Sequence, residues 1–190
     1  MTVNRHAPWH VAERRRVFAG GPVREVSVER VILPDGREID DYYRIDLADF
    51  ALVFPVTEDG EVLLLRQYKH GVGRTCTTCP GGAIAAAESA LDAARRELYE
   101  ETGFVSDAWT SLGSFVTNSN QRCNVAHLFI ARGCTSAGEP AAPDIENPEL
   151  LRIPLDRLWS TIDPGAVGLA CHVALMALAT HPVFGAVQRG

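Results

Sequence analysis

The hydrophobic and polar positions of the first seventy residues predict a succession of short strands. Apolar side chains alternate at Val26 and Val28 and continue into Val31 and Ile32, as in a strand with one buried face. The segment 34–36 (Pro-Asp-Gly) then predicts a turn, because proline presets φ and glycine accepts a positive φ. The predicted strands cover residues 23–33, 37–47, 51–57 and 61–68.

Residues 89–102 follow the helical period instead. Leu91, Ala94 and Leu98 share one face, and Gly103 follows the last turn, where a helix C-terminus favours glycine. Further strands are expected at 109–116, 125–131 and 150–153, an acidic loop rich in Pro and Ala at 135–148, and helical segments from residues 155 and 166. The apolar run 165–180 is shorter than the ~20 residues of a membrane span, so we interpret it as a buried terminal helix.

This order of elements favours an α/β (α+β) layer structure in which a mixed sheet packs against a few helices. The strands at 23–47 predict a small N-terminal antiparallel sheet. We therefore divide the chain into an N-terminal hairpin or sheet at residues 1–48 and a main domain at residues 49–190.

Composition narrows the classes of function. Hydrophobic residues make up 46% of the chain and charged residues 22%, which is ordinary for a globular protein with a core. The net charge of −6 argues against non-specific binding to nucleic acid, and no segment predicts membrane insertion. Residues 1–16 are polar and basic without the apolar centre of a signal peptide, and five cysteines is an odd number for a disulfide framework. We therefore expect a cytoplasmic protein with reduced thiols.

Three carboxylates give the predicted helix its chemistry. Glu97 and Glu101 are four residues apart, and Glu100 lies within the same arc, beside the apolar stripe. Clustered like charges destabilise a helix and need a counter-charge. A solvated acidic face is the ordinary explanation, but a hard divalent cation such as Mg²⁺ also suits carboxylate oxygens.

A longer pattern favours the cation. Gly82 is followed after five residues by Glu88 and, after seven more, by the run 96–104 (Arg-Glu-Leu-Tyr-Glu-Glu-Thr-Gly-Phe). Seven fixed identities at these spacings arise by accident on the order of once in ten million starts. This stretch resembles a complete Nudix box. Segments outside the box are similar to the ADP-ribose (ADP-sugar) pyrophosphatase branch of that family: 33–37, 66–69, 80–82 and 127–131.

The resemblance implies a Nudix α/β/α sandwich with a catalytic domain at 49–190. It implies that Mg²⁺, or Mn²⁺ in its place, is bound by Glu97, Glu100, Glu101 and the carbonyl of Gly81, with Glu97 and Glu101 also catalytic. Four residues of the motif would be structural: Gly82, Glu88, Arg96 and Gly103. An ion pair would join Glu88 to Arg96.

The implied reaction is hydrolysis of the diphosphate in a nucleoside diphosphate linked to another group, with ADP-ribose or an ADP-sugar giving AMP and a sugar phosphate. A loop carboxylate of this branch often acts as general base, and Glu149 and Glu146 are the candidates here. Arg66, Lys69 and Arg44 are candidates for substrate binding. Branch members resemble homodimers that form through their N-terminal sheets, and the segment 23–47 is consistent with that.

Departures from the branch leave the substrate open. Residues 85–87 are alanines, residue 78 is threonine, and 117–120 (Thr-Asn-Ser-Asn) replaces a common turn. GDP-mannose, NADH or a dinucleoside polyphosphate therefore remain alternative substrates, and a non-catalytic nucleotide-sensing module remains an alternative class.

Cysteine and histidine suggest no second metal centre. Cys76 and Cys79 have the spacing of metal ligands, but no second Cys or His pair matches them, and a thioredoxin-type helix does not follow. We expect thiols on a polar strand leading to residues 80–82. We expect His70, His127 and His172 to be core or surface residues rather than ligands.

Overall fold

The computed structural model describes residues 4, 6–140 and 148–182. The chain forms two compact units. The first comprises residues 1–48 and 116–125, and the second comprises residues 49–115 and 126–190.

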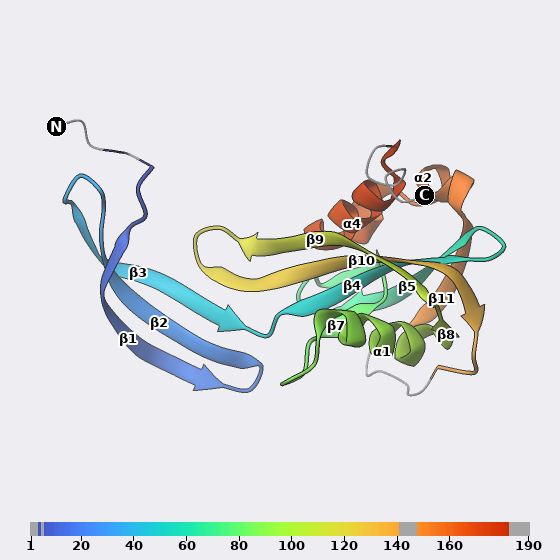
Figure 1. The fold of residues 1–190 in the computed structure, drawn as a ribbon, viewed down its shortest axis with the longest axis horizontal. Helices are drawn as coiled ribbons and strands as arrows, with labels where there is room; N and C mark the ends of the chain where they lie inside the picture. The colour runs from blue at the N-terminus through green and yellow to red at the C-terminus, as the bar shows by residue number, and fades with distance from the viewer. Residues whose placement is uncertain (1–3, 5, 141–147, 183–190) are drawn as a thin grey trace. The chain divides into compact units, whose positions relative to one another are not determined.

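The first unit is an antiparallel sheet of strands β1 (His10–Gly20), β2 (Val23–Ile32) and β3 (Glu38–Leu47), drawn in blue in Figure 1. Residues 122 and 123 pair in parallel with Ile45 and Asp46 of β3. The sequence pattern did not predict β1. Its side chains are nearly all exposed, and a run of charged residues at 13–16 interrupts the apolar ones, so it has no alternation of buried and exposed positions that would mark a strand.

The second unit is built on a mixed sheet. Strand β10 (Arg122–Ser136) lies parallel to β4 (Phe50–Thr57), whereas β5 (Glu61–Lys69) is antiparallel to both β4 and β11 (Glu149–Pro154). Shorter or flanking strands complete it: β6 (Arg74–Thr78) on β5, β7 (Gly81–Ala83) on β4, and β8 (Phe104–Val105) and β9 (Ala108–Asn118) on β10. Residues 135 and 136, expected in a loop, belong to β10, because they pair with β8.

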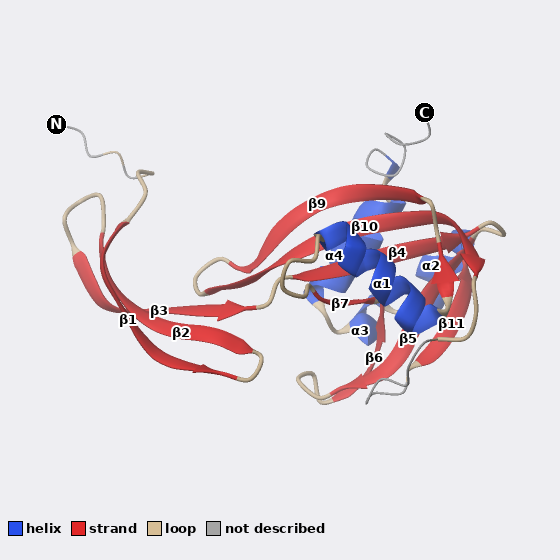
Figure 2. Ribbon diagram, turned by 60° about the horizontal axis from the view of Figure 1, so that its bottom comes forward, coloured by secondary structure: helices blue, strands red, loops and turns tan. Residues whose placement is uncertain are grey.

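Helices cover both faces of this sheet, as Figures 1 and 2 show. Helix α1 (Ala90–Thr102) buries Ala93, Ala94 and Leu98 against one face, which includes Ala51 and Leu63. The other face carries η1 (Leu155–Arg157), α2 (Leu158–Thr161), α3 (Pro164–Val167) and α4 (Ala170–Thr180). The expected α/β/α sandwich with a mixed sheet is therefore confirmed.

The prediction of one buried helix at 165–180 is wrong in its extent. Gly168 adopts a positive φ of 70° and separates α3 from α4. In α4 only Leu175 and Met176 are fully buried, and Ala174 and Ala177 are exposed. An apolar composition alone does not show which side of a helix faces the core. Among the described residues no helix is long and apolar enough to cross a membrane.

Candidate active site

Local capping fixes the ends of helix α1. The Ser89 hydroxyl accepts a hydrogen bond from the Asp92 amide at 3.1 Å, which satisfies one of the free N–H groups of the first turn. At the other end Gly103 has φ of 73°, and its amide donates to the Tyr99 carbonyl at 2.8 Å. A Cβ at residue 103 would collide with the backbone of Gly138, so both conformation and space require glycine.

Two glycines let the preceding turn approach the helix. A Cβ on Gly81 would lie 2.9 Å from the Leu52 Cα and closer still to the Ala51 carbonyl oxygen. A Cβ on Gly82 would lie 2.6 Å from Cδ of Glu97. The Gly81 amide donates to Oε2 of Glu101 at 2.7 Å. The turn at residues 80–82 is therefore held directly against two of the three box glutamates.

Arg96 connects the loop to the helix. Its Nε and Nη2 donate to the two oxygens of Glu88 at 2.9 and 3.1 Å, so the expected ion pair is present. Nη2 also donates to the Ala83 carbonyl at 3.0 Å. Nη1 lies 2.6 Å from Glu97 and 3.0 Å from Glu100. One guanidinium thus neutralises part of the carboxylate cluster and closes the segment 83–88 onto α1.

These contacts shift the ionisation of the glutamates in opposite directions. Burial raises the pKa of Glu97, and its contact with Arg96 offsets part of that increase. The hydrogen bonds from Arg96 and the Ala85 amide lower the pKa of Glu88. The carboxylates in turn raise the pKa of Arg96. A further cation beside the buried Glu97 would favour its charged form.

The three box glutamates are neighbours, but their side chains are held by different partners. Glu101 is bonded to the turn, whereas Glu97 and Glu100 contact Arg96. Within the described ranges, no group of three acidic, His or Cys side chains has the geometry of a metal site. Three carboxylates beside a backbone turn fit a hard divalent cation by donor type.

The structure also places the other expected site residues. Arg66 and Glu149 are direct partners across β5 and β11. Strand alternation puts them on the face that includes Leu64 and Leu151, whereas α1 packs on the opposite face. Glu149 is therefore not beside the box glutamates in this arrangement, and Glu146 lies outside the described residues. Lys69 ends β5, and Arg44 lies in β3 of the first unit opposite Ser27.

The cysteines and histidines do not form a metal centre in the part of the chain that the structure describes. Cys76 and Cys79 are free and buried, and desolvation raises the pKa of Cys79. His127 Nδ1 lies 2.8 Å from the Ser114 hydroxyl. His172 accepts a hydrogen bond at Nδ1 from the Cys79 amide at 3.0 Å, a contact that the sequence did not indicate.

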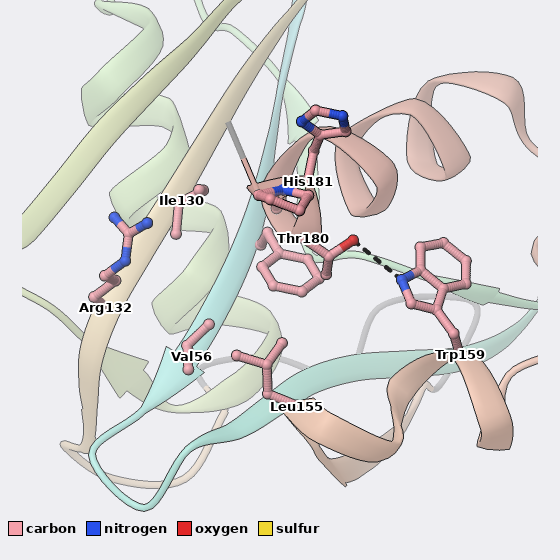
Figure 3. A pocket seen from close by; sticks show the side chains of 10 residues that line it. Val56, Ile130, Arg132, Leu155, Trp159, Thr180 and His181 are labelled. Carbon is pink, nitrogen blue, oxygen red and sulfur yellow. Dashed lines mark hydrogen bonds between the residues drawn. The ribbon is translucent and has the colours of Figure 1, made fainter. Parts of the chain in front are cut away.

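A pocket of about 350 Å³ opens on the face of the sheet covered by α2 and α4 (Figure 3). Phe54, Ile130 and Trp159 are among its lining residues, and the Trp159 indole donates to the Thr180 hydroxyl at 3.0 Å. No residue of α1 or of the turn at 80–82 lines it. This pocket is therefore separate from the glutamate cluster.

Comparison with known proteins identifies the family. The Nudix domain matches residues 46–168. The chain is 30% identical over 122 residues to an ADP-ribose pyrophosphatase from Bacillus subtilis (strain 168), covering 62% of this chain and 63% of that relative. It is 27% identical over 146 residues to a methanol dehydrogenase activator from Bacillus methanolicus, covering 74% of this chain and 76% of that relative.

A solved structure described as an ADP compounds hydrolase matches the fold with a TM-score of 0.77, at 20% identity, over 95% of this chain and 96% of the other. The box at Gly82–Phe104 lies within the matched domain, on the turn and helix described above. The chain belongs to the Nudix family.

Proposed function

We propose that this chain is a metal-dependent hydrolase that cuts the diphosphate of a nucleoside diphosphate linked to another group. The observation that carries the proposal is the hydrogen bond between Gly81 and Glu101, which joins the glycine turn to the helix bearing Glu97 and Glu100. ADP-ribose, giving AMP and ribose phosphate, is the leading substrate, because one relative is named for hydrolysing it.

Mg²⁺, or Mn²⁺ in its place, would be held by Glu97, Glu100, Glu101 and the Gly81 carbonyl, and when bound it would polarise phosphoryl oxygens and lower the pKa of water. The chain's own residues have separate tasks. Arg96 and Glu88 keep the loop on the helix. Glu146 is the favoured acceptor of the proton of the attacking water, because Glu149 lies on the sheet face opposite α1.

Substrate contacts are assigned to the basic residues expected from the sequence. Arg66 is exposed on β5, and its planar guanidinium suits a diphosphate. Lys69 lies three residues further along the same strand, and Arg44 lies in β3. These residues bind and orient the substrate in the proposal, whereas the box glutamates act at phosphorus.

The group beyond the diphosphate is the least constrained feature. The loop at 85–87 and the segment 117–120 differ from the branch pattern, and another relative is named an activator of methanol dehydrogenase. GDP-mannose, NADH and dinucleoside polyphosphates are therefore the alternative substrates. A non-catalytic nucleotide sensor is less favoured, because the glutamates of the box are all present.

The test is release of a nucleoside monophosphate from a panel of these compounds with Mg²⁺. Glu101→Gln keeps an oxygen that accepts from the Gly81 amide but removes the charge, so we expect turnover to fall by roughly a thousandfold or more with an unchanged circular dichroism spectrum. Glu58→Gln, on an exposed turn, is the matched control and should keep wild-type turnover. Wild-type inactivity on every diphosphate, or an active Glu101→Gln variant, contradicts the proposal.

We further propose that the protein is a homodimer that forms through the first unit. Large apolar side chains are exposed on β1 and β3, among them Val17, Phe18 and Tyr43. Such a surface favours association with another protein surface. Light scattering should give twice the mass of the chain, and Phe18→Glu should lower it; a monomeric wild type contradicts the dimer. The five free cysteines are consistent with the proposed cytoplasmic location.

A further inference from the structure

We infer that His172 is a positioning residue that holds the glycine turn in place for the box glutamates. This inference rests on the proposed function, because it concerns the same site. Nδ1 of His172, on α4, accepts a hydrogen bond from the Cys79 amide at 3.0 Å. Cys79 is the residue that leads out of β6 toward the turn at 80–82.

The Cys79 amide lies where the chain passes between two strand pairs. The pairing of β6 with β5 ends at Thr78, opposite Leu65, and the pairing of β7 with β4 begins at Gly81. Residue 79 is only 2% exposed, and Pro80 has no N–H group. A buried backbone donor at such a crossing needs an acceptor, and the imidazole of His172 provides it.

The effect reaches the glutamates through consecutive residues. The Pro80 carbonyl accepts from the Val53 amide at 2.9 Å, and the next amide, that of Gly81, donates to Glu101 at 2.7 Å. Gly82 then lies against the carboxylate of Glu97. A change in the path of Cys79 therefore moves the turn relative to α1.

The hydrogen bond also defines the state of the ring. A backbone N–H only donates, so Nδ1 carries no proton and the neutral ring is protonated at Nε2. Burial, with a smaller effect of the nearby charge of Lys69, lowers the pKa of His172 to about 4. The ring is therefore neutral at physiological pH, as this role requires.

The end of the polar strand β6 is also held by a hydrogen bond close to the turn. Thr78 is fully buried, and its hydroxyl accepts from the Gln67 side-chain amide at 2.8 Å. That bond joins the end of β6 to β5, and the His172 bond joins the following residue to α4. Hydrogen bonding at the entrance to the turn thus explains why the segment 75–79 is polar although buried toward its end.

Three variants test the inference. His172→Ala removes the acceptor. His172→Asn restores one, because Oδ1 of Asn and Nδ1 of His are both bonded to Cγ. Cys171→Ala is the control for a truncated neighbour on α4 that packs on the same core. We expect His172→Ala to lower kcat at least about tenfold and to raise the Mg²⁺ concentration for half-maximal activity, with KM for the nucleotide changed less than about threefold.

His172→Asn should recover most of the kcat, and Cys171→Ala should keep it even where its melting temperature falls. Equal impairment of the Ala and Asn variants, or an unchanged kcat in His172→Ala, overturns the inference. Hydrogen exchange at the Cys79 and Gly81 amides decides it independently of turnover. We expect exchange about tenfold faster in His172→Ala than in the wild type or His172→Asn. Equal protection of these amides in all three proteins would contradict the inference. Inactivity of the wild type would instead refute the proposed function alone.

Discussion

Arg96 donates to both carboxylate oxygens of Glu88, through Nε at 2.9 Å and through Nη2 at 3.1 Å. The same guanidinium contacts Glu97 and Glu100, so it is the counter-charge of the helix in this structure. The sequence pattern had suggested a cation from outside for that purpose. A divalent ion bound by Glu97 and Glu100, as proposed, would share these carboxylates with an internal positive charge.

Arg96→Lys should lower the free energy of unfolding by about 1–3 kcal/mol, because an ammonium group cannot make the two parallel bonds to Glu88 while also reaching Glu97. Urea denaturation measures this loss. Arg95→Lys is the matched control one residue away, where the 3.5 Å contact with Asp92 is exposed. Its effect should stay below about 0.5 kcal/mol. Equal losses in the two variants would show that the bidentate contact is not stabilising.

Gly82→Ala should reduce Mg²⁺-dependent turnover by about a hundredfold, because the added methyl group occupies the position of the Glu97 carboxylate and displaces it. Gly71→Ala is the control, since a Cβ at that residue meets no atom within 4 Å. Steady-state kinetics of both variants, with the melting temperature of each, separate displacement of Glu97 from general instability. Full activity in Gly82→Ala would exclude a role for this close approach.

The stability of the protein should depend on His172 between about pH 4 and pH 6.5. The pKa of His172 is about 4 in the folded chain, whereas its ordinary value, which the unfolded chain has, is 6.5. As the pH falls, the unfolded chain therefore binds a proton before the folded chain does. The stabilisation is complete above pH 6.5 and is lost toward pH 4, amounting to roughly 3 kcal/mol at most.

The measurement is the free energy of unfolding of wild type and His172→Asn at several pH values. The difference between the two curves should shrink as the pH falls. The titrations of Glu88, whose pKa is lowered, and of Glu97, whose pKa is raised, are common to both proteins and cancel in this difference. Parallel curves would show that His172 titrates normally.

Substitution of the two candidates for general base, Glu146 and Glu149, should have different effects on kcat. Glu149 lies opposite Arg66 in the register of β11 with β5, on the sheet face opposite α1, whereas Glu146 belongs to the segment 141–147. We expect Glu146→Gln to lower kcat by about two orders of magnitude or more and Glu149→Gln to change kcat less than about threefold. The pH–rate profile of each variant checks the assignment. Loss of the acidic limb in Glu149→Gln alone would reverse it.

Ala87 is a further point of strain that the structure exposes. Its φ of 64° is unfavourable for a residue with a Cβ, by about 1 kcal/mol or more. Ala87→Gly should therefore stabilise the fold by up to about 1 kcal/mol, after the greater freedom of glycine in the unfolded chain is subtracted. Ala86→Gly, next to it and without a positive φ, should destabilise by about 0.5 kcal/mol. Thermal unfolding distinguishes the two, and the same sign in both would refute the argument.

Elements with a regular apolar pattern were predicted correctly, whereas β1, which lacks one, was missed. The strands at 51–57 and 61–68 and the helix at 89–102 correspond to β4, β5 and α1 within a few residues. Each buries a run or a stripe of apolar side chains. Strand β1 was missed because its side chains remain exposed, so that only backbone pairing with β2 defines it.

The site was predictable where its partners are close in sequence. Glu88 and Arg96 are eight residues apart on a loop and the helix it enters, and their ion pair was expected. The hydrogen bond from Cys79 to His172 spans 93 residues and depends on how α4 packs on the sheet, so no local sequence pattern predicts it. The roles of Glu97, Glu100, Glu101, Arg66, Lys69 and Arg44 remain predictions.

Gly103 touches Gly138 backbone to backbone, and the Gly103 carbonyl accepts from the Ala137 amide at 2.8 Å. The helix that carries the metal-binding candidates and the chain that leads into the segment with Glu146 therefore share one anchoring point. Any change that lifts residue 138 from the end of α1 therefore disturbs the helix terminus. Substitution of Gly103 or of Gly138 should thus disturb the same contact, although the two residues are 35 positions apart in the chain.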